Sequence, residues 1–492
     1  MSSSTSRMRC MLTDYMVTTK PAGWQRVDRW FFVPMSPRWL AVLRIGAVFA
    51  MLYMLWPPSG TNLLATPRHL DHIPHSMWAP VSFTSLFFAI VGAPSDAMLD
   101  SLRWIATGAG VLVAVGLFTR TATAVCALAY LAYTGMGVSF RVTYSLGTPL
   151  YLLFLLGPFL DWGAAFSLDQ ARSGKPVPSP DVRFGVRLRA VHAMVGLLFF
   201  FAAVTKVANC GMQWVAGGIL ARYTMLFNLM PHIDPNYTLW AGEPRLTKLA
   251  EVVIKHPAIC KALELNTLLF EGLFFVSFFW RRAIPLFLLG AIGFHISIHL
   301  TIPPVLGIPW LPVYIACVAS YFASLPAAST DDTAAPRRTV ARWTVIAVLV
   351  VETGACFLGI GEPAPPKARM RRALWPFLPQ VMFSWKPPME GLVTSTYQLL
   401  DDNGQTLATV TQPMLLGSRI TSADLSTELN TPALAEAAAR YRCEHGPREA
   451  TQIAVTEVSW SYPSLIASYD AGTKYVPTSQ QVLRTASLRR CP

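Results

Sequence analysis

The sequence predicts an all-α polytopic membrane bundle of about nine transmembrane helices, followed by a soluble, strand-rich α+β domain at the C-terminus. Of the 492 residues, 53% are hydrophobic and 14% are charged, and the mean hydropathy is +0.41. That is more apolar surface than one soluble core buries. Long apolar runs fill residues 39–360, and short alternating segments replace them in residues 361–492.

Residues 1–38 are polar and carry six Arg or Lys before the first long apolar run. They do not combine a basic start, a short apolar stretch and a small-residue cleavage site, as a signal peptide would. We therefore expect a cytoplasmic N-terminal segment, and we expect the run from Trp39 to Trp56 to be an uncleaved anchor.

Nine runs approach the roughly 17–25 residues that a helix needs to cross the hydrocarbon layer. They are residues 39–56, 104–118, 121–139, 147–165, 188–207, 264–280, 283–301, 306–325 and 341–360. The second run is short, and the fourth contains Pro149 and Pro158, so neighbouring helices must satisfy its freed backbone groups.

The net charge of +13 comes mainly from short segments between the apolar runs. The excess of Lys and Arg in alternate segments predicts a cytoplasmic N-terminus, and it explains the charge better than nucleic-acid binding does. An odd number of spans then places residues 361–492 in a periplasm or lumen. Membrane lipid is the predicted partner of the bundle, and nucleic acid is not expected.

The C-terminal region shows strand-like alternation in residues 393–400, 405–410 and 453–460, and residues 432–441 are alanine-rich and helical. Asp402-Asn403-Gly404 is a turn signal between the first two strands. Cys443 could pair with Cys491, and Cys210 with Cys260, because an outer compartment permits disulfides. Unpaired buried thiols are an equally open alternative.

Lys206 follows an apolar stretch that begins at Leu197. An ionisable group at membrane depth is costly and is therefore a candidate functional residue. Desolvation disfavours the charged form of a lysine, and a neutral amine is a base. The alternative is that Lys206 anchors the outer end of its helix by extending to the headgroups.

His295 and His299 lie four residues apart and share one face of the seventh predicted span. They could hydrogen-bond a quinone, bind a metal, or bond to neighbouring helices. No metal is expected, because two histidines fall short of a usual ligand set and the histidines of residues 68–75 are interrupted by proline. Lys206, Trp214, both histidines and residues 68–75 all fall at the outer end of the predicted bundle, which suggests a site facing outward.

Four further ionisable residues fall inside predicted spans. Glu271 and Glu352 are at mid-depth, where a carboxyl group bonded across helices is the common structural outcome. Asp161 and His192 lie nearer the inner end, and we do not expect them in the same site as Lys206.

Several segments resemble the membrane domain (HTTM) shared by vitamin K-dependent γ-carboxylases and their bacterial relatives. The stretch Phe200-Phe201-Ala202-Ala203-Val204-Thr205-Lys206 is similar to the surroundings of the family's catalytic lysine. The other matching membrane segments are residues 116–120 (GLFTR), 159–161 (FLD), 167–169 (SLD), Trp214 with Gly217, 294–295 and 307–313. Residues 383–386, 402–404, 420–425 and 455–460 resemble the family's lumenal β-rich domain.

The resemblance implies an enzyme in which Lys206 deprotonates a reduced vitamin K or related hydroquinone. The quinol anion reacts with O2, and the resulting alkoxide removes a γ-proton from a glutamate in a peptide or protein. That glutamate takes up CO2, and the quinone leaves as its epoxide. Candidate contacts for the quinone or substrate are Tyr144, Trp214, His295 and His299.

The sequence departs from the family pattern at one position. The family has a histidine at the start of the span that ends at the Phe-Leu-Asp block, and counting back from Asp161 places Leu146 there. A quinol epoxidase without glutamate carboxylation is therefore the first alternative function. A membrane transporter or envelope protein is a second, although the sequence lacks the repeated halves typical of transporters. An iron-dependent desaturase would need more paired histidines than the nine in this chain.

Overall fold

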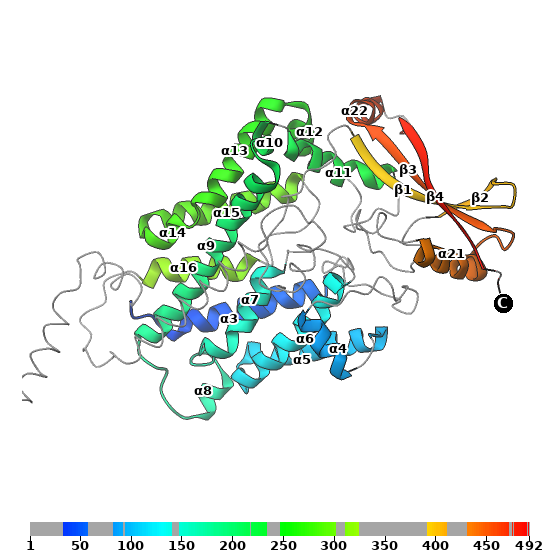
Figure 1. Cartoon of the computed structure of the whole chain (residues 1–492). Coiled ribbons are helices and arrows are strands. Elements are labelled where there is room, and N and C mark those ends of the chain that lie inside the picture. Colours follow the sequence, from blue (N-terminus) through cyan, green and yellow to red (C-terminus); the bar gives the residue numbers. More distant parts are fainter. Residues whose placement is uncertain are drawn as a thin grey trace, which may run out of the picture.

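The computed structural model describes most of the bundle and of the C-terminal domain (Figure 1). The described residues are 33–57, 82–91, 94–139, 147–216, 218–233, 247–301, 310–323, 391–410, 431–471, 475, 477–489 and 491. The ninth predicted span, residues 341–360, lies outside them. Among these residues, fourteen α-helices and two 3-10 helices precede the four-stranded sheet.

The first half of the bundle is built from five helices, of which three are long and two are short. They are α3 (Pro37–Leu55), α4 (Ser82–Val91), α5 (Asp96–Val115), α6 (Thr119–Ser139) and α7 (Thr148–Leu156). Ser36 accepts a hydrogen bond from the amide of Arg38, and proline follows at the first helical position, so α3 begins where capping rules place it. After α7, a 3-10 turn over Gly157–Phe159 ends the fourth predicted span early, at the second of its two prolines.

The second half is organised around α9 (Val182–Cys210), which is the longest described helix. Helices α13 (Pro257–Leu273) and α16 (Leu311–Ala323) pack directly against it, together with the short α14 (Val276–Phe279). Helix α15 (Ile284–Thr301) follows α14 after a 3-10 turn over Arg281–Ala283. The short α8 (Leu168–Arg172) precedes α9.

The segment 208–263, expected to be a long outer loop, contains helices. These are α10 (Gln213–Ala216), α11 (Ile219–Ile233), α12 (Lys248–Lys255) and the first turns of α13. Thr247 caps α12 by accepting from the amide of Ala250, and Pro257 begins α13 directly after it. Helices α11 and α12 are shorter than a membrane span, and the Thr247 cap of α12 is visible in the sequence.

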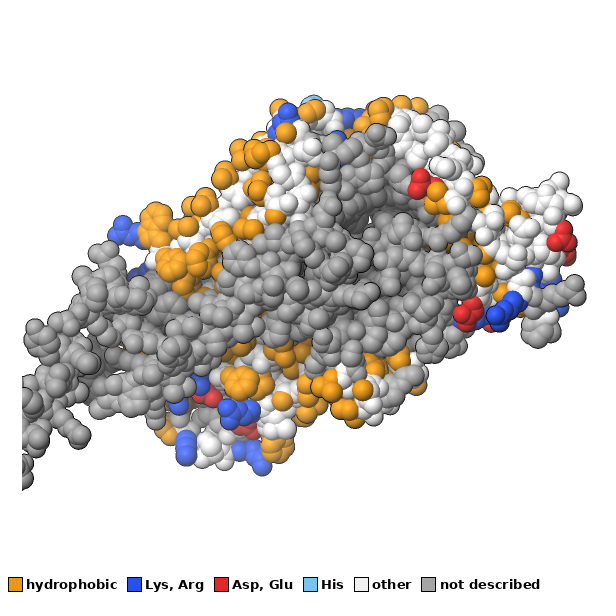
Figure 2. All heavy atoms as spheres, in the orientation of Figure 1, with side chains coloured by type: hydrophobic (Ala, Val, Ile, Leu, Met, Phe, Trp, Pro, Cys, Tyr) orange, Lys and Arg blue, Asp and Glu red, His pale blue; other side chains and the backbone are white. Residues whose placement is uncertain are grey.

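Five described helices are long and apolar enough to cross a membrane. They are Pro37–Leu55, Asp96–Val115, Val182–Cys210, Pro257–Phe279 and Arg281–Ile298, with shorter apolar helices at Thr148–Phe159 and Leu311–Phe322. Leu286 and Leu289 on α15 are 70% and 69% exposed, as suits side chains that face lipid. Figure 2 shows apolar side chains along the bundle and basic ones near α8 and at the end that carries α14. The total of nine spans stays a prediction.

The C-terminal domain contains an antiparallel sheet in the order β2-β1-β3-β4. Its strands are β1 (Gly391–Leu400), β2 (Thr406–Val410), β3 (Gln452–Ser461) and β4 (Ser479–Ser487). The first three strands and α21 (Thr431–His445) confirm the alternation and alanine-rich patterns, and Gly404 takes the left-handed conformation (φ 77°) in the predicted turn. Strand β4 and α22 (Tyr462–Ala471) were not predicted.

The sheet lies at one end of the bundle, next to α11 and α12 and away from α14 (Figure 1). Met225 and Leu229 of α11 pack with Trp460 of β3 and Leu465 of α22 in one buried apolar cluster. Lys255 at the end of α12 pairs with Asp470 of α22 at 2.8 Å. The domain therefore joins the bundle through the helices that follow α9.

Candidate functional site

Lys206 is 1% exposed near the end of α9, and its ammonium group meets a carboxylate. Nζ lies 2.9 Å from Oε1 and 2.7 Å from Oε2 of Glu271, which is 4% exposed on α13. Both oxygens of one carboxylate thus accept from the same amine. A buried, bidentate pair between two apolar helices is the most polar contact in this part of the bundle.

The local sequence explains why Lys206 is buried. Helix α9 continues for four residues beyond it, to Cys210, so the side chain is not at the helix end. Thr205, its neighbour, satisfies its own hydroxyl by donating to the carbonyl groups of Phe201 and Ala202. The alternative in which Lys206 reaches out to the headgroups is wrong, because its amine turns into the bundle toward Glu271.

Trp214 of α10 lies beside the pair. Its ring centroid is 5.4 Å from Nζ of Lys206, a cation–π distance, and the side chain is 2% exposed. Its indole Nε1 has no hydrogen-bond partner among the described residues. Tyr223 of α11 follows at 6.4 Å between ring centroids. The pair is therefore bordered by the aromatic face of Trp214, with Tyr223 behind it.

The carboxylate of Glu271 was not assigned to this site from the sequence. The sequence placed it at mid-depth with an unnamed cross-helix partner, and the partner is Lys206, 65 positions away. A signal existed, because an acid and a base buried in neighbouring spans stabilise each other's charges. Which spans are neighbours follows from packing, since α9 and α13 make one of the most extensive contacts in the bundle.

This arrangement can exchange a proton. The amine and the carboxylate together are neutral whether the proton resides on nitrogen or on oxygen. A second proton, taken from a hydroxyl group nearby, would give the pair one positive charge next to the anion it creates. Such charge compensation matters in an apolar site, where isolated charges are costly.

His295 belongs to a second polar contact, on α15. Its Nδ1 lies 2.5 Å from the hydroxyl of Tyr314 and 2.9 Å from the carbonyl of Ala291. The ring sits 5.1 Å from Trp310 and 6.3 Å from Phe199 between centroids. Among the described contacts none joins His295 to Lys206 directly, and the ring of Phe199 lies against His295 from α9, the helix that also carries Lys206.

The remaining predicted residues lie outside the part that the structure describes. Tyr144, Leu146 and residues 68–75 are not among the described positions, and neither is the side chain of His299. Their roles stay predictions. No group of three or more His, Cys, Asp or Glu that could hold a metal occurs within the described ranges.

The segments with GLFTR, FLD and SLD come together at the opposite end of the bundle. Asp169 accepts from the amides of Phe118 and Thr119 and from the Thr119 hydroxyl, and so caps α6 from a distance. Gly116 has φ 71°, and a Cβ there would lie 2.2 Å from the side chain of Ser167. Close backbone approach explains the glycine.

Arg44 of α3 secures the same junction. It is fully buried, and it donates to the carbonyl groups of Trp162, Ala114 and Phe166. Close to this junction, Asp161 forms an ion pair with Arg187 of α9. Within the described residues these segments build a structural joint far from Lys206 rather than part of its site.

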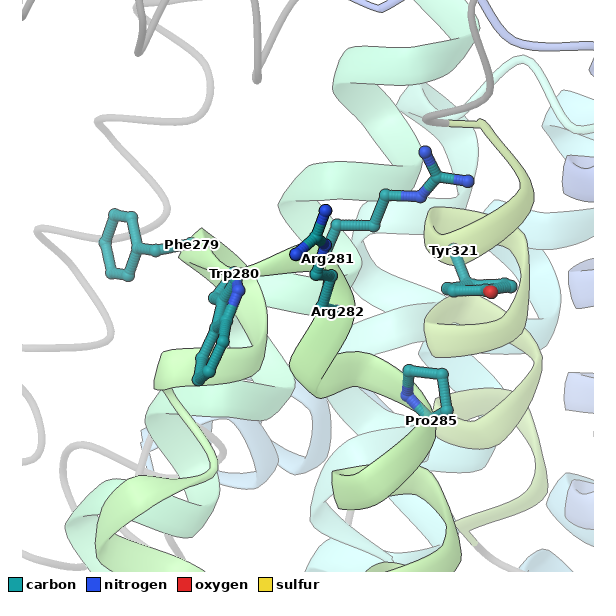
Figure 3. A pocket seen from close by; sticks show the side chains of 6 residues that line it. All are labelled: Phe279, Trp280, Arg281, Arg282, Pro285 and Tyr321. Atoms are coloured by element: carbon teal, nitrogen blue, oxygen red, sulfur yellow. The ribbon is translucent and has the colours of Figure 1, made fainter.

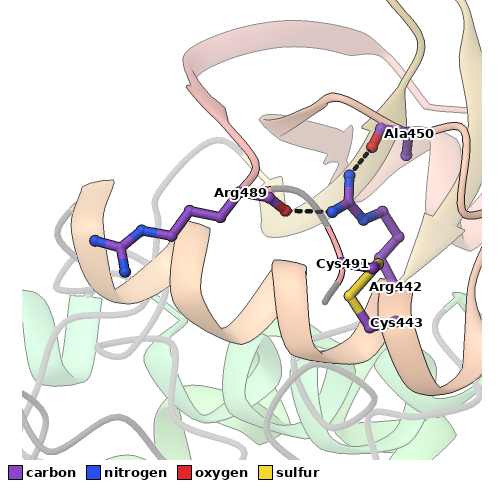
Figure 4. The surroundings of a disulfide bond; sticks show 5 residues. All are labelled: Arg442, Cys443, Ala450, Arg489 and Cys491. Carbon is purple, nitrogen blue, oxygen red and sulfur yellow. Dashed lines mark hydrogen bonds between the residues drawn. A yellow bond between two sulfur atoms is a disulfide. The ribbon is translucent and has the colours of Figure 1, made fainter.

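Of the two cysteine pairings that the sequence suggested, the structure contains one. Cys443 and Cys491 form a disulfide that ties α21 to the end of the chain (Figure 4). Next to it, Arg442 donates to the carbonyl groups of Ala450 and Arg489. The pairing of Cys210 with Cys260 is not formed, and both side chains are buried.

Comparison with known proteins gives no match from which a function could be inferred. No protein-family model, curated protein or solved structure matches the chain.

Proposed function

We propose that the chain is an integral membrane enzyme of the vitamin K-dependent γ-carboxylase type, with Lys206 as the base for a reduced quinone. The observation that carries the proposal is the buried pair of Lys206 and Glu271, 2.7 Å apart beside Trp214. A hydroquinone is an apolar ring with an acidic hydroxyl group. A buried amine next to an aromatic face suits both properties.

The first step is a proton transfer. The hydroquinone hydroxyl gives its proton to the pair, and the quinol anion remains beside a pair that has gained one positive charge. In the form of the pair that has a neutral amine and a protonated carboxyl group, Lys206 takes up this proton and Glu271 keeps its own. The hydrogen bonds between the two groups hold the amine in place, and loss of one proton from the pair restores the neutral form for the next turnover. This carboxylate extends the predicted site, in which Lys206 was the only residue expected to take part in the proton transfer.

The later steps follow the resemblance. The quinol anion reacts with O2, and the alkoxide that results removes the γ-proton of a glutamate, which takes up CO2 while the quinone leaves as its epoxide. Trp214, His295, His299 and Tyr144 are the candidate contacts for quinone or substrate. His295 can serve through its hydrogen bond with Tyr314 at 2.5 Å. No metal takes part in this scheme.

The topology is part of the proposal. The N-terminus lies in the cytoplasm, and the C-terminal domain lies in the periplasm or lumen. The packing of that domain on α11 and α12 supports approach of a peptide or protein substrate from its side, since Tyr223 of α11 lies against Trp214, which borders the Lys206 pair.

The test is epoxide formation by purified full-length protein in detergent, supplied with reduced vitamin K and O2. Labelled bicarbonate and a glutamate-containing peptide are run alongside. Lys206→Ala should lower the rate of epoxide formation at least about hundredfold. Lys206→Met/Glu271→Gln removes both charges together, so it should fold and yet be inactive.

The matched control is Lys248→Ala, because that lysine has a fully solvated side chain (98% exposed) on α12. It should keep the native rate. Loss of activity in this control, or equal rates in native protein and Lys206→Ala, would overturn the assignment of Lys206. Absence of epoxide from folded native protein would overturn the quinol reaction and direct attention to transport or envelope assembly.

Leu146 favours a second candidate, a quinol epoxidase without carboxylation, because the related enzymes have a histidine there. The same experiment separates the two. Epoxide together with label in the peptide supports the carboxylase, whereas epoxide without label supports the bare epoxidase.

A further inference from the structure

A pocket of about 620 Å³ opens at the turn between α14 and α15. It is lined by Phe279, Trp280, Arg281, Arg282, Pro285 and Tyr321. Figure 3 shows both arginine side chains between Trp280 on one side and Tyr321 on the other. The turn connects two helices that are each long enough to cross a membrane, so the pocket lies at the level of the lipid headgroups.

The pocket is positively charged. Two guanidinium groups line it, and no acidic side chain is among its described lining residues. Arg281 is positioned 5.2 Å from the ring centroid of Tyr321. Arg189, buried in α9, interacts electrostatically with Arg281 and donates to the carbonyl of Ser320 at 3.3 Å.

The rim of the pocket is apolar and open. Phe279 and Trp280 are 56% and 59% exposed. Aromatic residues are enriched at membrane–water interfaces, where one part of the side chain meets headgroups and another meets hydrocarbon. Helix α15 begins at Ile284, so its positive end adds to the field of the arginines.

We propose that this pocket binds the phosphate group of an anionic phospholipid. Arg281 and Arg282 contact the phosphate oxygens, which match the fork of a guanidinium, while Trp280 and Phe279 lie beside the glycerol and acyl chains. Basic pockets between membrane helices are suited to such headgroups. The site is separate from Lys206 and does not depend on the reaction proposed there.

The test uses full-length protein in nanodiscs that contain phosphatidylglycerol and phosphatidylcholine in equal amounts. Lipids retained after transfer to detergent are counted by native mass spectrometry. The native chain should retain phosphatidylglycerol in preference. Arg281→Gln/Arg282→Gln should lower that retention about tenfold, and Arg281→Lys/Arg282→Lys, which keeps the charge without the fork, should fall between the two.

The matched control is Arg172→Gln/Lys175→Gln, which removes two exposed charges near α8 and should retain the lipid like the native chain. Equal loss in this control, or no loss in the double arginine variant, would overturn the proposal. A third arm adds inorganic phosphate to the lipid-loaded native protein. Complete displacement by millimolar phosphate would identify a site for the free anion and overturn the lipid as its source.

Discussion

Two buried cations in this bundle donate hydrogen bonds to acceptors of different kinds. Arg44 of α3 is 0% exposed and donates to three backbone carbonyl groups, including that of Trp162 at 2.8 Å. Lys206 of α9 is 1% exposed and donates to both oxygens of one carboxylate, that of Glu271. The arginine lies at the joint made by GLFTR and SLD, and the lysine lies near the C-terminal domain.

The difference concerns what each partner can accept. A backbone carbonyl accepts a hydrogen bond but does not take up a proton at ordinary pH, and an arginine keeps its own. The surroundings of Arg44 are thus fixed and structural. A carboxylate can be protonated, so the environment of Lys206 can hold a variable number of protons. Burial alone does not separate a structural cation from a reactive one, whereas the chemistry of its partner does.

The largest expected effect on stability is at the lysine pair. Lys206→Met should destabilise the protein by about 3–5 kcal/mol, because it leaves the buried carboxylate of Glu271 without its cation. Lys206→Met/Glu271→Gln should recover most of that loss. Thermal unfolding in detergent checks both variants, and a double variant no more stable than the single one would contradict the coupling.

Arg44→Met should cost about 3 kcal/mol, because it leaves the carbonyl groups of Ala114, Trp162 and Phe166 without donors. No second substitution can compensate, since these acceptors belong to the backbone. The same unfolding measurement applies. Activity per folded molecule should stay native, and a selective loss of activity would place Arg44 in the reactive site after all.

Cys443→Ser/Cys491→Ser should destabilise the C-terminal domain by about 2–4 kcal/mol, because the bond closes a loop with a sequence separation of 48. Limited proteolysis should then cleave this domain faster and leave α9 and α13 protected. Equal protection of the domain with and without reductant would contradict the prediction. Cys210→Ser is the matched control, since that residue takes part in no disulfide.

Asp169→Asn should have the smallest effect, about 1 kcal/mol, by weakening the cap of α6. Partial burial acts to raise the pKa of Asp169, but hydrogen bonds from Thr119 and Phe118 outweigh it and hold the pKa below its usual value. The carboxylate therefore stabilises the fold above a pH of about 4, its unfolded value, and that contribution is lost as pH falls through the lower folded pKa. Unfolding measured from pH 6 downward should show this loss in the native chain and not in the variant.

The sequence was most informative where the signal is local. Apolar runs predicted the long helices, alternation predicted β1 to β3, and the apolar context singled out Lys206. Strand β4 escaped prediction because its sequence, SQQVLRTAS, lacks regular alternation and forms the edge of the sheet. Helices α11 and α12 in residues 208–263 are shorter than a membrane span, so the length of an apolar run does not reveal them.

Non-local features were the ones that sequence could not supply. The pairing of Lys206 with Glu271 depends on which face α13 turns toward α9, and that face is set by the packing of helices far apart in the sequence. The pocket at Arg281 and Arg282 likewise requires Tyr321 from another helix. The arginines were visible in the sequence only as a marker of orientation.

The order of synthesis gives the lysine pair a consequence for biogenesis. Helix α9 leaves the ribosome before α13, so Lys206 must enter the membrane while its partner, 65 positions later, does not yet exist. A lone lysine costs about 2.5–3.5 kcal/mol at the centre of an inserting helix and less near its end, where Lys206 lies, and the apolar run from Leu197 to Ala203 can offset that cost. When α13 inserts, Glu271 pairs with Lys206, and this ion pair then stabilises α9 in the membrane.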